Sequence, residues 1–260
     1  MGLVYVDNTN SFRLTDVKSV FPTINRLSQA FAQSSDGYFG AQKGVKDRQT
    51  NFRNYATKFG YLYNAFTFTN LAATGWHVPS YAEWNILIAY LGGQSPANSA
   101  LKIVNTIHWA APGGYGSSNT SNFNAKGGGY RSYNSGDYSQ RTLGYYWTSD
   151  FYYVSMSSGL ASTSAGGPLT TDNGKRQGYS IRLLKNSTTL TNGQVGSYTG
   201  NDGIVYPTIC VGTQEWLADN LKEKKLNTGA NIVYISVGAW GVDNTPARCA
   251  YWDYDNDTMV

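Results

Sequence analysis

The stretch Gly75-Trp76-His77-Val78-Pro79-Ser80-Tyr81-Ala82-Glu83-Trp84 carries the strongest local signal in this chain of 260 residues. Ser80 and Glu83 have the spacing of a capping box, in which a hydroxyl and a carboxylate each bind a free amide at the start of a helix. Gly92-Gly93 is a typical helix stop. Between them, apolar residues recur at helical spacing, at Trp84, Leu87, Ile88 and Leu91.

We therefore expect a helix from Tyr81 to Leu91 with one face in the core. The same reading gives Glu83 a structural role and no catalytic one. The side chains that we expect to be largely buried are Trp76, Trp84, Leu87, Ile88 and Trp216.

Further blocks of similar character lie on both sides of this helix. They are Tyr61-Leu62-Tyr63-Asn64, Gly128-Gly129-Tyr130-Arg131, Tyr146-Trp147-Thr148-Ser149, Gly178-Tyr179-Ser180-Ile181-Arg182-Leu183-Leu184-Lys185, Asp202-Gly203-Ile204-Val205-Tyr206 and Val211-Gly212-Thr213-Gln214-Glu215-Trp216-Leu217-Ala218-Asp219-Asn220-Leu221-Lys222. Together these blocks resemble the Fibrobacter succinogenes major paralogous domain. That resemblance implies a C-type-lectin-like α+β fold with irregular antiparallel strands and few helices.

The order of the blocks departs from the family pattern. In the family, the D-G-x-x-Y and G-x-Q-x-W-x-x-x-N-L motifs come first, whereas here they follow residue 200. The tail Asp253-Tyr254-Asp255-Asn256-Asp257 resembles the family segment that leads directly into the motif at Tyr61. The resemblance therefore implies a circularly permuted domain, in which residues 201–256 pack against 55–185, within one subunit or between neighbouring subunits.

This interpretation divides the chain into an N-terminal appendage, residues 1–50, and the lectin-like domain, residues 51–260. Within the domain, 51–185 is the main part, 186–200 a flexible linker rich in Ser, Thr, Asn and Gly, and 201–260 the permuted first strands. We expect short strands at Tyr145–Thr148 and Tyr179–Leu184, and another that opens at Gly128-Gly129-Tyr130-Arg131. The appendage carries an apolar stripe at helical spacing for attachment or oligomerisation, made of Phe21, Ile24, Leu27 and Phe31.

Composition excludes several classes of protein. Hydrophobic residues make up 41% of the chain, charged residues only 14%, and the net charge is +4. A disordered chain or a nucleic-acid-binding protein would be more charged, and no apolar run is long enough to cross a membrane. The two cysteines, Cys210 and Cys249, are interpreted as free buried thiols, although a single disulfide is an alternative.

The sequence contains no convincing catalytic or metal-binding motif. His77 and His108 are interpreted as hydrogen-bonded structural histidines. Asp253, Asp255 and Asp257 alternate, but they lack the glycine and the terminal glutamate of an EF-hand loop, so we expect a polar turn there. The segment around Trp84 is also similar to formylglycine-generating enzymes, but neither cysteine lies in a matching motif. We therefore predict no enzyme activity, no cofactor and no metal ion.

Residues 112–178 are the best candidate for a binding surface. They form long loops rich in Tyr, Ser, Gly and Asn, a composition that antibody paratopes use because tyrosine gives large, rigid contacts. Some of these tyrosines must fill the core instead. The candidate ligand-binding residues are Tyr130, Arg131, Tyr133, Asn134, Asp137, Tyr138, Arg141, Tyr152 and Tyr153.

These observations lead to a hypothesis of surface attachment. We expect a virion fibre or receptor-binding subunit of a bacteriophage that infects Bacteroidetes, located on the virion surface, which binds glycan or protein receptors of the host. Its N-terminal segment would contact other virion structural proteins, and the subunit would form a homo-oligomer such as a trimer. The beginning of the chain lacks the pattern of a signal peptide, which favours this setting. The alternative is a secreted or surface-anchored bacterial adhesin of the same family.

Overall fold

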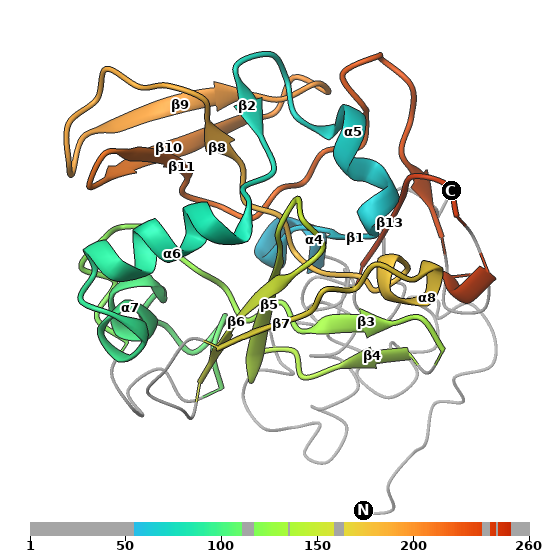
Figure 1. Cartoon of the computed structure of the whole chain (residues 1–260), viewed down its shortest axis with the longest axis horizontal. Helices are drawn as coiled ribbons and strands as arrows, with labels where there is room; N and C mark the ends of the chain where they lie inside the picture. The colour runs from blue at the N-terminus through green and yellow to red at the C-terminus, as the bar shows by residue number, and fades with distance from the viewer. Residues whose placement is uncertain are drawn as a thin grey trace, which may run out of the picture. The chain divides into compact units, whose positions relative to one another are not determined.

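The computed structural model describes residues 55–110, 117–134, 136–158, 164–235, 240–242 and 244–250. The chain divides into two compact units, Met1–Phe52 and Arg53–Val260, and every described residue belongs to the second. The apolar stripe from Phe21 to Phe31 and the acidic tail from Asp253 to Asp257 lie outside the described residues. The second unit is an α+β structure with mostly antiparallel strands and short helices, as we predicted (Figure 1).

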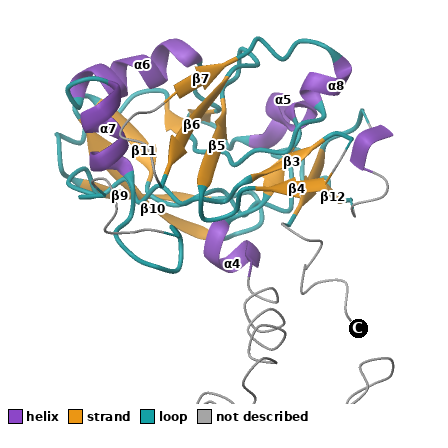
Figure 2. Cartoon of the chain, turned by 90° about the horizontal axis from the view of Figure 1, so that it is seen from below, coloured by secondary structure: helices purple, strands orange, loops and turns teal. Residues whose placement is uncertain are grey.

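The helices of the described region are short. They are α4 (Tyr55–Phe59), η3 (Ala65–Thr67), α5 (Phe68–Leu71), α6 (Tyr81–Tyr90), α7 (Gln94–Leu101), α8 (Asp172–Lys175) and η4 (Trp240–Val242), where η marks a 3₁₀ helix. Figure 2 shows α6 and α7 on one side of the strands β5 to β7, and α5 and α8 on the other.

The strands form four small sheets. The largest has the order β2 (Trp76–His77), β8 (Leu184–Lys185), β11 (Gln214–Leu217), β10 (Val205–Val211) and β9 (Val195–Thr199). A second sheet joins β1 (Leu62–Tyr63), β13 (Ala247–Cys249) and β12 (Val233–Tyr234). The remaining two are β3 (Tyr130–Ser132) with β4 (Gly136–Tyr138), and β5 (Leu143–Trp147) with β6 (Tyr153–Ser157) and β7 (Ser164–Gly166).

Helix α6 confirms the strongest local prediction. The Ser80 side chain accepts a hydrogen bond from the Glu83 amide, and the Glu83 carboxylate accepts one from the Ser80 amide, so the capping box is complete. Trp84, Leu87 and Ile88 are buried, and Trp216 packs against Trp84 with ring centroids 4.8 Å apart. Trp76 differs from the prediction and is only half-buried, because the short strand β2 lies at the edge of its sheet.

The C-terminal block packs against the main part of the domain, and this packing is within the same chain, which is one of the two arrangements that the sequence left open. Strand β13 pairs antiparallel with β1, so that Leu62 lies opposite Cys249. Strand β11 pairs with β8, so that Trp216 lies opposite Leu184. The first and last described segments therefore lie side by side, and Phe59 packs against Ala250.

Two segments differ from their predicted local structure. The linker region 186–200 contains β9, which pairs with β10 along its whole length and buries Tyr198. The polar composition of this region gave no strand signal, because Tyr198 is its one core-facing side chain and the neighbours of Tyr198 face solvent. The segment Tyr179–Leu184 is no continuous strand, because Tyr179 bridges to Tyr63 whereas Ser180 bridges to Tyr146 in a different sheet.

Strands β5 and β6 separate two hydrophobic clusters. Alternate residues point to opposite faces of a strand. Tyr146 and Val154 lie opposite each other and belong to the cluster that contains Trp84. Trp147 and its partner Tyr153 instead contact the cluster on the other face. Strands β5 and β6 are thus packed on both faces. Half-buried rings lead from both clusters to the surface, Tyr81 from the one that contains Trp84, and Tyr130, Tyr145 and Tyr153 from the other.

Candidate binding surface

Two of the predicted ligand-binding residues belong to a cluster of four tyrosines. Tyr130 of β3 and Tyr153 of β6 are half-buried, and they meet Tyr145 of β5 and Tyr179. The ring centroids of Tyr130 and Tyr145 are 4.8 Å apart, and those of Tyr145 and Tyr153 are 5.1 Å apart. Tyr179 lies behind them, stacked on Tyr145 at 5.2 Å and almost completely buried. We refer to these four residues as the tyrosine cluster.

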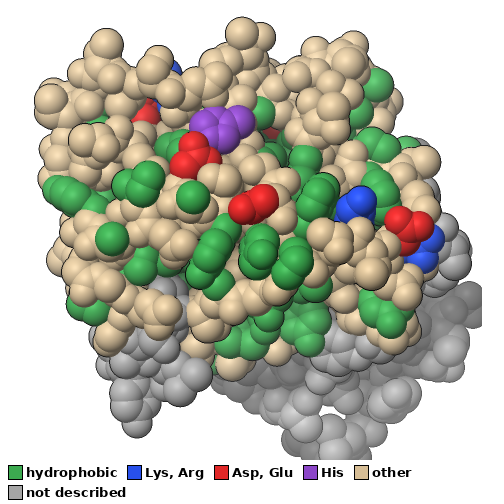
Figure 3. Space-filling model, viewed as in Figure 1, with side chains coloured by type: hydrophobic (Ala, Val, Ile, Leu, Met, Phe, Trp, Pro, Cys, Tyr) green, Lys and Arg blue, Asp and Glu red, His purple; other side chains and the backbone are tan. Residues whose placement is uncertain are grey.

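The backbone of the sheet fixes the positions of these rings. Tyr145 pairs with Ser155, and Trp147 pairs with Tyr153, so the side chains of this register share one face of β5 and β6. Small partners such as Ser155 leave room for the rings to lie against one another. Figure 3 shows hydrophobic side chains gathered on this face of the molecule over β5 to β7, with charged side chains near α8.

Burial dominates the electrostatics of two members of the cluster, Tyr145 and Tyr179. Burial, reinforced by the neighbouring Tyr153 and Tyr130, raises the pKa of Tyr145 above its ordinary value. Burial also raises the pKa of Tyr179 strongly, with the same neighbours adding to the effect. The phenols of Tyr145 and Tyr179 therefore stay uncharged, and the tyrosine cluster places hydroxyls that donate and accept hydrogen bonds beside apolar ring faces.

The other predicted ligand-binding residues do not gather at this cluster. Arg131 is only 1% exposed, and its guanidinium lies 5.7 Å from the centroid of the Trp240 ring, so it cannot meet a ligand at the surface. Arg141 is exposed, but it donates a hydrogen bond to the Thr106 carbonyl, in another part of the surface.

Three further candidates take different positions. Tyr152 stacks on Tyr81 at the start of α6, with ring centroids 5.3 Å apart. Asn134 is exposed and accepts a hydrogen bond from Ser132, whereas Tyr133 is half-buried. The backbone of Asp137 and Tyr138 lies in β4, but their side chains are outside the described part of the structure.

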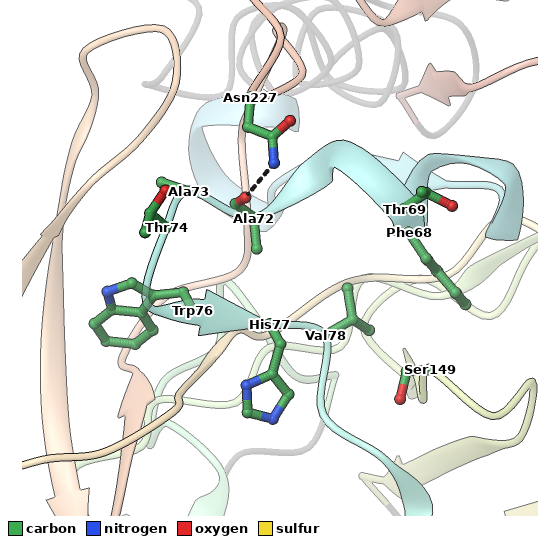
Figure 4. A pocket seen from close by; sticks show the side chains of 10 residues that line it. All are labelled: Phe68, Thr69, Ala72, Ala73, Thr74, Trp76, His77, Val78, Ser149 and Asn227. Atoms are coloured by element: carbon green, nitrogen blue, oxygen red, sulfur yellow. Dashed lines mark hydrogen bonds between the residues drawn. The ribbon is translucent and has the colours of Figure 1, made fainter.

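A cleft that the sequence analysis missed lies between α5 and β2 (Figure 4). Its volume is about 360 Å³. The residues that line it are mostly apolar or hydroxyl-bearing: Phe68, Thr69, Ala72, Ala73, Thr74, Trp76, His77, Val78, Ser149 and Asn227. Trp76 and His77 were visible in the strongest sequence block, but they were interpreted there only as structural residues. The cleft depends on contacts between that block, α5 and the turn after β5, which no local pattern indicates.

His77 is held firmly at the edge of this cleft. Its Nδ1 atom lies 2.7 Å from the Asn186 side-chain oxygen, and its Nε2 atom lies 2.9 Å from Glu83. The hydrogen bonds from Ser80 and from His77 lower the pKa of Glu83 despite its partial burial. Both ring nitrogens are engaged, which confirms the interpretation of His77 as a hydrogen-bonded structural histidine.

The remaining candidates for chemistry have structural surroundings. The two ring nitrogens of His108 lie within hydrogen-bond distance of Asn105 and of the Lys58 carbonyl, and burial lowers its pKa to about 4. Cys210 and Cys249 are both buried and are not joined in a disulfide, as we predicted. Within the described ranges, no group of three or more His, Cys, Asp or Glu side chains is arranged to hold a metal ion. None of the helices in these ranges has both the length and the apolar character needed to cross a membrane.

Comparison with known protein families gives a match that covers the main part of the domain. The sequence model of the Fibrobacter succinogenes major domain matches residues 24–185, which is more than half of the chain. The chain belongs to the Fibrobacter succinogenes major domain family. The matched range begins within residues 1–50 and ends at residue 185, before the block 201–250, whose strands β13 and β11 pair with β1 and β8 of the matched range. No curated protein and no solved structure matches the chain.

Proposed function

We propose that this Fibrobacter succinogenes major domain protein is a non-enzymatic attachment protein that binds glycan or protein receptors on a bacterial surface. The observation that carries the proposal is the tyrosine cluster, in which β3, β5 and β6 hold three half-buried aromatic rings and their hydroxyls side by side. Aromatic faces pack against the apolar faces of sugar rings and against protein side chains, and the hydroxyls bind polar groups beside them. A rigid sheet presents such a surface at low entropic cost.

The finer description of the fold is part of this proposal. We infer a C-type-lectin-like domain whose chain order is circularly permuted. The pairing of β13 with β1 and of β11 with β8 supports the inference, because the late block occupies positions next to the early one. Strand β9 then lies in the stretch that connects the two blocks.

The setting that we propose is the surface of a bacteriophage virion, where the protein would be a fibre or receptor-binding subunit. The division of the chain after Phe52 supports a mounting segment followed by a binding domain. The mounting segment would attach the protein to other virion proteins or form a homo-oligomer such as a trimer. Removing residues 1–50 is expected to abolish assembly, measured by light scattering, and to leave the binding domain folded. Capsid and tail genes beside the coding gene would support the virion, whereas an adhesin would be expressed on a bacterial surface.

The binding proposal is tested with variants of the tyrosine cluster. A double variant, Tyr130→Phe with Tyr153→Phe, keeps the ring packing and removes two hydroxyls, and Tyr153→Ser removes a ring. Both are expected to weaken binding on a glycan array or to whole cells. Tyr90→Ser is the matched control, because Tyr90 is an exposed tyrosine on α6, outside the cluster. Unchanged binding by the double variant, with an unchanged melting temperature, would contradict the proposal.

A further inference from the structure

We propose that the cleft between α5 and β2 binds one uncharged sugar ring of a receptor glycan, next to the tyrosine cluster. This inference rests on the proposed attachment function and adds a second contact site to it. Nothing in the sequence patterns indicated this cleft, and none of the predicted ligand-binding residues lines it.

The size and the lining of the cleft suit a small polar ring. Pockets that hold small ligands have volumes from about 300 to 1,000 Å³, and this cleft, at about 360 Å³, is at the lower end of that range. Phe68 and Val78 give it an apolar wall, whereas Thr69, Thr74 and Ser149 place hydroxyls around it. Sugar rings have this combination of an apolar face and a hydroxyl-bearing edge.

The charges around the cleft favour a neutral ligand. Among the residues that line it, none is Lys, Arg, Asp or Glu. The one titratable lining residue, His77, is engaged through both ring nitrogens by Asn186 and Glu83. The Lys185 ammonium lies 5.6 Å from the centroid of the Trp76 ring, but it is already paired with Glu215 at 3.0 Å. An acidic sugar would therefore lose its hydration in the cleft without gaining an unpaired cation, and burial of an unpaired charge is strongly unfavourable.

The cleft is held in place before any ligand binds. The Asn227 side chain donates a hydrogen bond to the Ala72 carbonyl at 2.9 Å, which joins the C-terminal block to the end of α5 (Figure 4). The turn that carries Ser149 contains Phe151 with φ of 64°, a left-handed conformation that is unfavourable for a phenylalanine. Such strain persists only where the surrounding structure enforces it, and it concentrates at functional sites.

The cleft and the tyrosine cluster are connected by aromatic contacts. Phe68, in the cleft wall, meets Trp147 edge to face with centroids 5.5 Å apart. Trp147 in turn lies 4.5 Å from Tyr179 of the tyrosine cluster. A glycan of more than one residue can therefore place one ring in the cleft and continue over the tyrosines, which would combine two weak contacts into a stronger one.

The test uses the full chain labelled with ¹⁵N, titrated with single methyl glycosides of glucose, galactose, mannose and N-acetylglucosamine. We expect at least one of them to shift the Trp76 indole signal and the Ser149 amide signal, with a dissociation constant in the millimolar range that is typical for so small a ligand. Glucuronic acid and N-acetylneuraminic acid are the charged comparison, and glycerol is the control for unspecific hydroxyl effects. Trp76→Phe assigns the indole signal.

Two variants separate the cleft from the rest of the surface. Ser149→Tyr adds a ring at an exposed lining position and is expected to abolish the shifts, whereas Ser187→Tyr, at an exposed position outside the lining, is expected to preserve them. The proposal is overturned if none of the neutral glycosides shifts these signals, if the charged sugars shift them equally, or if Ser149→Tyr leaves them unchanged. Attachment that is lost in the tyrosine-cluster variants while the cleft still binds a glycoside would support both sites. Attachment that survives those variants would contradict the proposed function alone.

Discussion

Arg182 shows how single buried residues hold this domain together. Its guanidinium is fully buried and donates hydrogen bonds to the Asn220 side chain and to the carbonyls of Phe123, Asn124 and Leu217. Asn220 also donates to the Phe59 carbonyl. The network therefore joins the early, middle and late parts of the chain through the planar fork of one arginine, which a lysine cannot reproduce.

We expect Arg182→Lys to lower the free energy of unfolding by about 3–5 kcal/mol, because several buried carbonyls lose their donor. Urea denaturation followed by tryptophan fluorescence measures this change. The matched control is Arg141→Lys, at an exposed arginine, where a change of about 0.5 kcal/mol or less is typical. Equal effects of the two substitutions would show that the buried network is not important for stability.

Glu223 is the second residue with a distinct physical signature. Its side chain is completely buried beside Asp202, and one of its carboxylate oxygens has no hydrogen-bond partner. Burial, followed by the negative charge of Asp202, raises the pKa of Glu223 to about 8. The other titratable groups around it are tyrosines, namely Tyr63, Tyr198 and Tyr206, whose hydroxyls do not supply a positive charge.

The raised pKa has a consequence for stability. A glutamate in an unfolded chain has a pKa of about 4.3, so the folded state binds the proton more tightly. The contribution of Glu223 is fully present below pH 4 and is lost as the pH rises from about 4 to about 8. We expect the free energy of unfolding to fall by on the order of 5 kcal/mol over that window because of this residue.

The measurement is the difference between the native protein and Glu223→Gln, each unfolded in urea at several pH values. The difference between the two proteins is necessary because His108 also makes the stability depend on pH. The pKa of His108 is lowered to about 4, so its contribution to the free energy of unfolding increases as the pH rises from about 4 to about 6.5, opposite to that of Glu223. The amide of the variant cannot ionise, so the pH dependence assigned to Glu223 should disappear. Parallel curves for the two proteins would contradict this account.

At the scale of elements, α6 and β9 differ in whether local sequence or pairing with another strand determines them. Helix α6 has its start, its buried face and its end within the stretch from Ser80 to Gly93, and these signals agree with one another. Strand β9 has a polar composition and one core residue, Tyr198, so its identity depends on pairing with β10. The first could be predicted from local sequence, and the second could not.

We predict that Ser80→Ala lowers the free energy of unfolding by about 1 kcal/mol, the usual effect of losing an N-cap hydroxyl. The Ser80 hydroxyl accepts a hydrogen bond from the Glu83 amide and donates one to the Glu83 carboxylate. The substitution removes both hydrogen bonds. Thermal unfolding followed by circular dichroism measures the change. Ser187→Ala, at an exposed serine outside any helix, is the control, and it should leave the melting temperature unchanged.

At the scale of the whole molecule, the order of the chain and the order of the strands disagree. Strands β10 and β11 come late in sequence, yet they lie inside a sheet whose edge is β2. The late segment also ends beside the first described helix, since Phe59 packs against Ala250. A domain built in this way tolerates the movement of its ends, because the contacts depend on the strands and not on the loops that join them.

This arrangement predicts that a reordered chain will fold. In the rearranged protein, residues 195–260 come first and are followed directly by residues 51–185. We expect it to retain the native far-ultraviolet circular dichroism spectrum and the same pattern of dispersed ¹H–¹⁵N signals. A reordered chain that is unfolded, while the deletion of residues 1–50 alone is tolerated, would argue against the proposed circular permutation.

The sequence by itself determined the family, the α+β class, and helix α6 with its capping box. These properties depend on short motifs and on periodicity, which are local. Only the tertiary structure decided which tyrosines form the tyrosine cluster, that Arg131 is buried, that the supposed linker contains β9, and that a cleft lies beside Trp76. Those properties depend on contacts between residues far apart in the chain, and the burial of a side chain is set by its neighbours in space rather than in sequence.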